Sequence, residues 1–100
     1  MRVKIWVDDY RPVPDGYVWA HSVDEAISGI ITCEQLGIII DLIDTDHDAG
    51  DYAKYGGDYI KLLEWLEKTG RNYPIRIHTM NPVGAENMRR IIRKNNWIEL

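Results

Sequence analysis

The chain has 100 residues, enough for one domain with a hydrophobic core and too few for two. It is 45% hydrophobic and 28% charged, a composition typical of folded proteins rather than of disordered ones. The net charge is −4, and an acidic chain is a poor candidate for unspecific binding of duplex DNA. The charge is unevenly divided: −7 on residues 1–50 (ten acids, three bases) and +3 on residues 51–100 (six acids, nine bases). No apolar run reaches the length of a membrane span, and the N-terminus lacks a signal-peptide pattern. Because Cys33 has no disulfide partner either, we expect a single cytoplasmic domain, residues 1–100.

The first third of the chain predicts two strands and a helix. Residues 3–7 alternate in character and stop at an acidic pair, as a strand does. Residues 11–16 contain two prolines and a glycine, which leaves a loop, and the aromatic and β-branched residues 17–20 predict a second strand. Ser22 and Glu25 have the spacing of a capping box, in which the serine accepts a first-turn amide and the glutamate reaches back. A helix is therefore expected to begin there.

The remaining chain alternates between strands and helices. Residues 38–43 are a nearly continuous β-branched run, typical of a strand buried on both faces, and an acidic loop follows it. Residues 58–69 have the apolar spacing of a helix, which Gly70 ends. Residues 75–79 predict a strand, and Asn81, followed by a proline, predicts the start of another helix.

The order of these elements predicts the topology. Strands alternating with amphipathic helices imply right-handed crossovers and a mainly parallel sheet with helices on both faces. Residues 8–16 are a short connection for two parallel strands, which are normally joined by a dozen or more residues; the parallel arrangement is nevertheless our prediction. Residues 97–100 are either irregular or a final edge strand. Ligands of such sheets bind beyond the carboxyl ends of the strands, where the polar clusters of this chain lie.

Three aspartates at these strand ends are candidate metal ligands. Asp8 and Asp9 follow the first strand, and Asp46 follows the third. Neighbouring carboxylates repel one another unless a cation or a proton lies among them, and hard oxygen ligands suit Mg²⁺ or Mn²⁺. The alternative is that these acids only end their strands.

Two histidines at the same edge are candidate proton-transfer groups. His47 lies between Asp46 and Asp48, and a carboxylate beside an imidazole fixes its tautomer and raises its basicity. His78 closes the fourth strand, so we expect both histidines at one rim. The alternatives are a solvated turn for His47 and a structural role for His78.

The start of the last helix is a candidate anion site. Free amides and partial positive charge gather at a helix N-terminus, so Asn81 and Gly84 are predicted to bind a phosphate, with Gly84 leaving space for it. Arg11 either adds a guanidinium to the same anion or pairs with an aspartate. An ordinary helix cap is the alternative. Four basic residues on the polar face of that helix form either a solvated surface or a partner site: Arg89, Arg90, Arg93 and Lys94.

Three motifs together resemble one known family. Residues 8–14 (DDYRPVP), 46–50 (DHDAG) and 78–84 (HTMNPVG) are similar to the motifs of the cyclic-phosphate-processing receiver-like domains, a divergent branch of the response-regulator receiver fold. They occur in the family's order and span nearly the whole chain. The resemblance implies a trimmed, three-layer, receiver-like (flavodoxin-like) α/β fold, with a mainly parallel sheet of four or five strands and about three helices.

The resemblance also implies roles for individual residues. Asp8 and Asp9 match the metal-binding acids of receivers, Asp46 matches the phosphoacceptor aspartate, and Thr79 matches the strand-end hydroxyl. His47 and His78 are additional to ordinary receivers and connect the family with cyclic phosphates.

These features predict a small phosphoesterase that opens cyclic phosphates of nucleotides or RNA ends. In that prediction His47, His78 and Thr79 are catalytic, Arg11, Asp48, Asn81 and Gly84 bind the phosphate or substrate, and Asp8, Asp9 and Asp46 hold Mg²⁺ or Mn²⁺. One alternative is a module that binds cyclic nucleotides or phosphorylated ends without cleaving them. Another is a receiver-like domain that binds a protein partner through its basic last helix.

Overall fold

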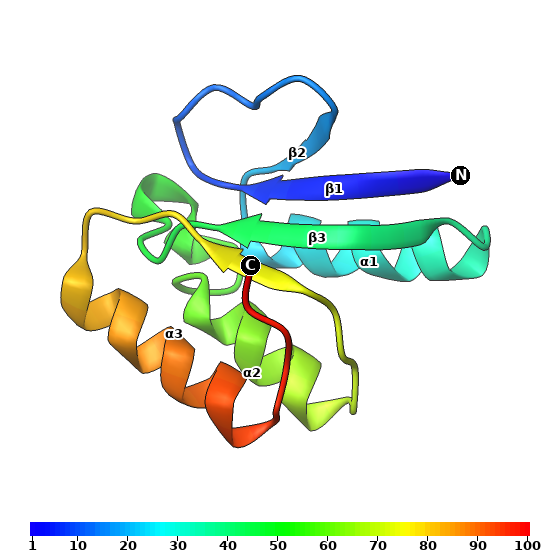
Figure 1. The fold of residues 1–100 in the computed structure, drawn as a ribbon. Helices are drawn as coiled ribbons and strands as arrows, with labels where there is room; N and C mark the ends of the chain where they lie inside the picture. Colours follow the sequence, from blue (N-terminus) through cyan, green and yellow to red (C-terminus); the bar gives the residue numbers. More distant parts are fainter.

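The computed structural model describes residues 1–100 and contains a four-stranded sheet. The strands are β1 (Arg2–Val7), β2 (Tyr17–Ala20), β3 (Ile39–Thr45) and β4 (Ile75–Ile77). They lie in the order β2-β1-β3-β4, and each neighbouring pair is parallel (Figure 1). The predicted parallel sheet is therefore confirmed, including the pairing of β1 with β2 across a short connection.

Three α-helices follow the strands at the expected places. They are α1 (Val23–Gln35), α2 (Ile60–Lys68) and α3 (Pro82–Lys94), and a short 3₁₀ helix, η1 (Gly50–Lys54), follows β3. None of the helices combines the length and the apolar character that crossing a membrane requires.

The capping interactions explain where two helices begin, and one differs from its prediction. The Ser22 hydroxyl accepts the Glu25 backbone N–H at 3.0 Å, and the side-chain Oδ1 of Asn81 accepts the Gly84 N–H at 2.9 Å. The Glu25 carboxylate does not reach back to Ser22, because it lies 3.3 Å from His21 Nδ1 instead. The first helix thus has a serine cap without the reciprocal half of a capping box.

The helices form a single layer on one face of the sheet. α2 packs against both α1 and α3, and buried side chains of all three helices share a core with strand residues Ile5, Val7, Ala20, Ile43 and Ile75. The receiver-like α/β arrangement is as expected, but all three helices lie on one face of the sheet, whereas three layers with helices on both faces were predicted. The connection from β1 to β2 contains no helix, and the opposite face of the sheet is left without one (Figure 1).

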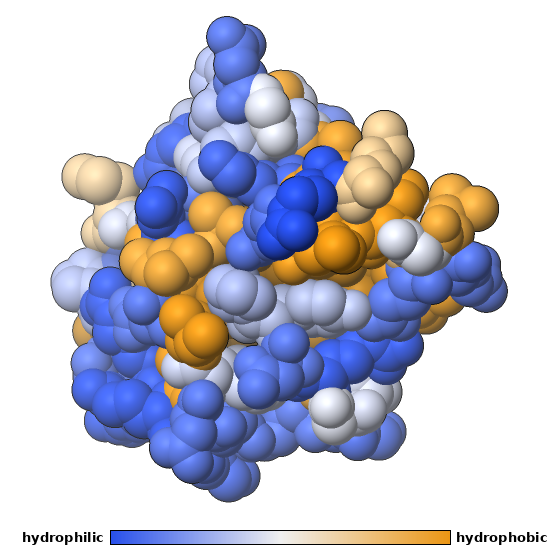
Figure 2. Space-filling view, turned by 45° about the vertical axis from the view of Figure 1, so that its right-hand side comes forward, coloured by the Kyte–Doolittle hydropathy of each residue, from blue (hydrophilic) through white to orange (hydrophobic).

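That open face carries aromatic and basic side chains. Strand register places Lys4 beside Tyr17 and Trp6 beside Trp19, and all four alternate with the core-facing residues. Trp6 and Tyr17 meet edge to face with ring centroids 5.7 Å apart. The face of the molecule drawn in Figure 2 shows hydrophobic patches bordered by hydrophilic side chains.

The two tryptophans explain how so short a connection joins parallel strands. The Trp6 indole donates to the Arg11 carbonyl at 3.2 Å, and the Trp19 indole donates to the Asp8 carbonyl at 2.8 Å. These bonds satisfy backbone acceptors of a loop that has no helical partner groups. The loop is therefore fastened to the sheet by side chains.

Several boundaries differ from the sequence prediction: β4 ends at Ile77 and not at residue 79, and α2 spans Ile60–Lys68 and not residues 58–69. β3 continues through Asp44 to Thr45, both of them buried. The C-terminal segment adds one isolated parallel bridge, between Ile75 and Glu99, instead of a complete edge strand. Trp97 still anchors this segment in the core, where it is 9% exposed.

Candidate functional site

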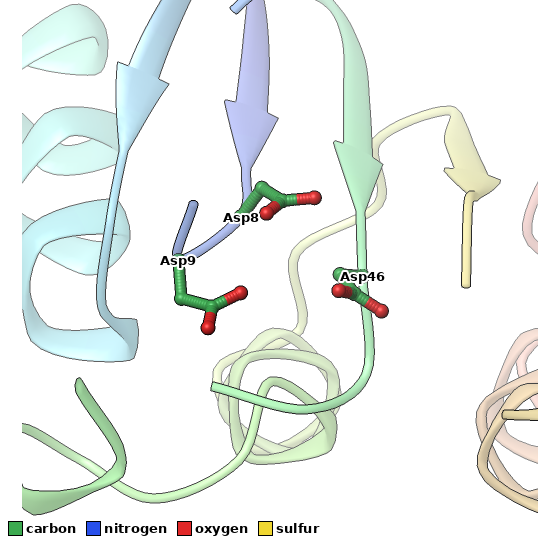
Figure 3. Close-up of side chains that lie close together, drawn as sticks. All are labelled: Asp8, Asp9 and Asp46. Carbon is green, nitrogen blue, oxygen red and sulfur yellow. The ribbon is translucent and has the colours of Figure 1, made fainter. Parts of the chain in front are cut away.

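Asp8, Asp9 and Asp46 form an acidic cluster at the carboxyl edge of the sheet. Each offers an oxygen, and these three oxygens lie within 4.8 Å of one another. Figure 3 shows the carboxylates gathered beyond the ends of β1 and β3. Asp8 is fully buried and Asp46 is 5% exposed, so the predicted convergence of these acids holds in the structure.

Asp8 is held in its ionised form by many donors. Burial alone would raise its pKa, but backbone N–H groups of Arg11 and Tyr10 and the ring of His78 outweigh that effect and lower the pKa below its usual value. The two N–H groups donate to Asp8 Oδ1 at 2.9 and 3.0 Å. Oδ2 lies 2.8 Å from His78 Nε2.

Asp9 has the opposite environment. Burial, together with the negative charges of Asp8 and Asp46, raises its pKa. Its Oδ1 is buried and has no hydrogen-bond partner. A partnerless carboxylate oxygen among three acids fits a hard divalent cation.

The Arg11 guanidinium provides a positive charge next to the acidic cluster. Its Nη1 lies 3.0 Å from Asp46 Oδ2 and 3.3 Å from Asp8 Oδ2. Burial opposes its charge, but Asp46 and Asp8 prevail and raise the pKa of the guanidinium. Of the two roles expected for Arg11, pairing with aspartates is the one seen.

A pocket of about 260 Å³ opens beside the acidic cluster. Its lining includes six residues singled out from the sequence, and Tyr10, Gly50 and Met80 complete it. The six are Asp9, Arg11, Asp46, Asp48, Thr79 and Asn81. Asp8, His47, His78 and Gly84 lie outside the lining.

His78 bridges two buried carboxylates. Its Nδ1 lies 2.7 Å from Asp44 Oδ1 and its Nε2 lies 2.8 Å from Asp8 Oδ2. The ring also stacks on Trp6, with centroids 3.8 Å apart and planes 5° apart. Since ionised carboxylates only accept, this geometry requires a proton on both ring nitrogens or on one of the acids. Neither nitrogen is free to meet a substrate.

His47 has one free ring nitrogen. Nδ1 lies 2.7 Å from Asp48 Oδ1, and the hydrogen bond to His47, opposed by burial and assisted by Asn81, lowers the pKa of Asp48. Nε2 makes no hydrogen bond within the protein. A carboxylate that orients an imidazole with its other nitrogen free is a general-base arrangement.

Gly84 has a different role from the predicted one. A Cβ at this position would lie 2.5 Å from Cγ of the His47 ring, so the missing side chain makes room for His47 and not for a phosphate. The Gly84 N–H is also occupied, because it donates to the Asn81 cap. The helix start thus positions His47 and Asn81, whose side-chain amide donates to Asp48 at 3.3 Å.

Replacing Gly84 by alanine is therefore expected to displace the His47 ring without unfolding the protein. Alanine normally stabilises a helix interior by about 1 kcal/mol relative to glycine, and the clash offsets that gain. Gly29 in α1 is the matched control, because nothing lies within 4 Å of its hypothetical Cβ. Urea unfolding should show Gly29→Ala stabilised and Gly84→Ala not, and the His47 ring NMR signals should move only in Gly84→Ala. If the Gly84→Ala variant is stabilised and its His47 ring signals are unchanged, the close packing of His47 against Gly84 is contradicted.

The basic face of α3 is largely neutralised. Arg89 pairs with Glu99 at 2.8 Å, Arg93 pairs with Glu86, and Lys94 lies 3.4 Å from Glu67. Such ion pairs are ordinary for a solvated helix face. They weaken the case for a docking surface made by this charge run.

Fold and site together define a class of protein. A parallel sheet in receiver order, with an acidic cluster beyond β1 and β3 and a hydroxyl residue after β4, is a receiver-like domain. The chain belongs to the cyclic-phosphate processing receiver domain family, whose family model matches residues 3–94. Searches of curated proteins and of solved structures returned no match.

Proposed function

We propose that this domain binds a cyclic phosphate of a nucleotide or RNA end in the pocket and hydrolyses it to a phosphomonoester. The observation that carries the proposal is the set of groups around one cavity: Arg11, Thr79 and Asn81 in its lining, the acidic cluster at its wall, and the His47–Asp48 pair beside it. Membership in the family supports the same substrate class.

The proposed reaction adds water across one phosphorus–oxygen bond. His47 Nε2 takes a proton from the attacking water while Asp48 holds the imidazole, one ester bond of the ring breaks, and the leaving oxygen gains a proton from solvent. Arg11, Thr79 and Asn81 bind the phosphate oxygens. Asp8, Asp9 and Asp46 would hold a divalent cation, which supplies positive charge against the charge that develops on the phosphoryl group.

We assign His78 to positioning rather than to proton transfer. Both of its nitrogens are used by Asp44 and Asp8, and it therefore fixes the orientation of a proposed metal ligand. This assignment differs from the expectation that both histidines transfer protons, one of them activating water and the other protonating the leaving oxygen.

Incubation with 2′,3′- and 3′,5′-cyclic nucleotides in the presence of Mg²⁺ or Mn²⁺, followed by chromatography, tests the proposal directly. Conversion to a monoester supports hydrolysis. Ligand that is bound but recovered intact supports the second candidate, a sensor module, which is favoured by the position of His47 outside the pocket lining. If the cyclic nucleotides are neither bound nor converted, that result contradicts both the hydrolase and the sensor module.

Asp9 offers a test of the metal that does not depend on turnover. Because the pKa of Asp9 is raised in the folded state, its ionisation weakens folding as pH rises above the ordinary value of 3.8. Asp9→Asn is expected to stabilise the metal-free protein at pH 7 by up to about 1 kcal/mol, a gain that vanishes below pH ~4. The same variant should lose most of its affinity for Mn²⁺, measured by calorimetry. A destabilised variant with unchanged Mn²⁺ affinity contradicts the role given to Asp9.

A further inference from the structure

We propose that Arg11 is a built-in counter-ion of the acidic cluster which a divalent cation displaces into the pocket, so that metal binding creates the arginine site for phosphate. This inference rests on the proposed function for the existence of the metal. It adds an order to the binding events. The metal-free protein holds Arg11 on its own carboxylates, and only the metal-loaded protein offers it to an anion.

Asp8 has no unoccupied oxygen for a metal. Its Oδ1 accepts two backbone N–H groups, and its Oδ2 contacts both His78 and Arg11. Asp46 Oδ1 accepts one hydrogen bond, from the His47 N–H at 2.7 Å, and its Oδ2 contacts Arg11. Arg11 Nη1 therefore contacts Oδ2 of both acids.

A divalent cation that uses these two oxygens must therefore take the place of a present partner. Asp8 Oδ2 has two, His78 at 2.8 Å and Arg11 at 3.3 Å. His78 is stacked on Trp6 and bound at its other nitrogen. Arg11 makes the longer contact through a flexible side chain, and a guanidinium beside a divalent ion is repelled. Arg11 is the partner that leaves.

The structure gives the released guanidinium a place to go. The Arg11 side chain is 29% exposed and already lines the pocket beside Thr79 and Asn81. Its backbone is fixed, because the N–H donates to Asp8 and the carbonyl accepts from Trp6. Only the side chain has to turn, and a freed arginine fork is suited to two oxygens of one phosphate.

Nitrogen-15 NMR of the arginine side chains during titration with Mg²⁺ tests the displacement. The Arg11 side-chain signal, assigned by its loss in Arg11→Lys, should shift on saturation, and its exchange with water should accelerate. Arg76 is the internal control, because it contacts Asp44 at 3.6 Å and touches no residue of the acidic cluster. Its signal should stay in place.

Affinity measurements on matched variants complete the test. Arg11→Gln removes the competitor and should bind Mg²⁺ about ten-fold more tightly, within the usual range for coupled ligands, whereas Arg76→Gln should change affinity less than two-fold. In wild type, Mg²⁺ should strengthen the binding of inorganic phosphate, and Arg11→Gln should lose most of that gain.

Two results would overturn the displacement while leaving the metal site in place. The first is an unchanged Arg11 signal in Mg²⁺-saturated protein, and the second is an Arg11→Gln variant that binds Mg²⁺ no better than wild type. Either result leaves the hydrolysis proposal standing if cyclic nucleotides are still cleaved. If neither wild type nor Arg11→Gln binds Mg²⁺, both the displacement and the proposed metal site are overturned. Cleavage of cyclic nucleotides without added metal would then show that the hydrolysis proposal holds without the metal.

Discussion

Replacing His78 by alanine is expected to destabilise the protein by about 3 kcal/mol, because two buried carboxylates lose the hydrogen-bond partner that they share. Asp8 and Asp44 are 0% and 2% exposed, and His78 is the residue that touches both. For a domain of this size the loss corresponds to a fall in Tm of more than 10 °C. Thermal and urea unfolding at pH 7 measure it.

The pH dependence identifies the cause. The pKa of Asp8 is lowered in the folded state, so the stability it contributes is complete above the ordinary value of 3.8 and is lost as pH falls through the lower, folded value. The difference between wild type and His78→Ala should therefore shrink below pH ~4. His21→Ala is the matched control, since His21 pairs only with the half-exposed Glu25 and stacks on Trp19. Equal losses in the two variants would show that His78 is not a bridge between buried acids.

The sequence predicts only part of the bridging role of His78. The charge of Asp44 suggested that the third strand ends before it, but Trp6, Asp44 and Arg76 occupy one register across three strands. The alternation of side chains along β1 and β4 also places Trp6 and Arg76 on the open face. What alternation does not give is the distance between the side chains on that face.

The candidate site was predictable to a similar degree. Strand ends placed Asp8, Asp9 and Asp46 at one edge, because parallel strands end together. Tyr10 and Met80 were missed as lining residues, since neither residue type signals a polar site; both are exposed, at 70% and 86%. The prediction that Gly84 leaves space for a phosphate was wrong, because the His47 ring fills that space. The packing of His47 against α3 is a tertiary contact that no local sequence pattern encodes.

Replacing His47 by alanine is expected to lower the hydrolysis of cyclic nucleotides at least about 100-fold, the usual contribution of a proton-transfer group. Asp48→Asn should have a smaller effect, about ten-fold, because the ring keeps a hydrogen-bond partner but loses the neighbouring negative charge. Both effects should fall on kcat more than on KM, since neither variant removes Arg11, Thr79 or Asn81 from the pocket. Steady-state kinetics with a 2′,3′-cyclic nucleotide measures them.

The two histidines are thereby distinguished by different readouts. His47→Ala should cost less stability than His78→Ala, because the partner of His47, Asp48, faces solvent at 59%, whereas both partners of His78 are buried. His78→Ala should lose stability first, and whatever turnover remains should retain the pH profile set by His47. If instead His47→Ala leaves turnover intact while His78→Ala changes the shape of that profile in the folded protein, the proton passes through His78, and the arrangement of Asp8, His78 and Asp44 is a relay rather than a brace.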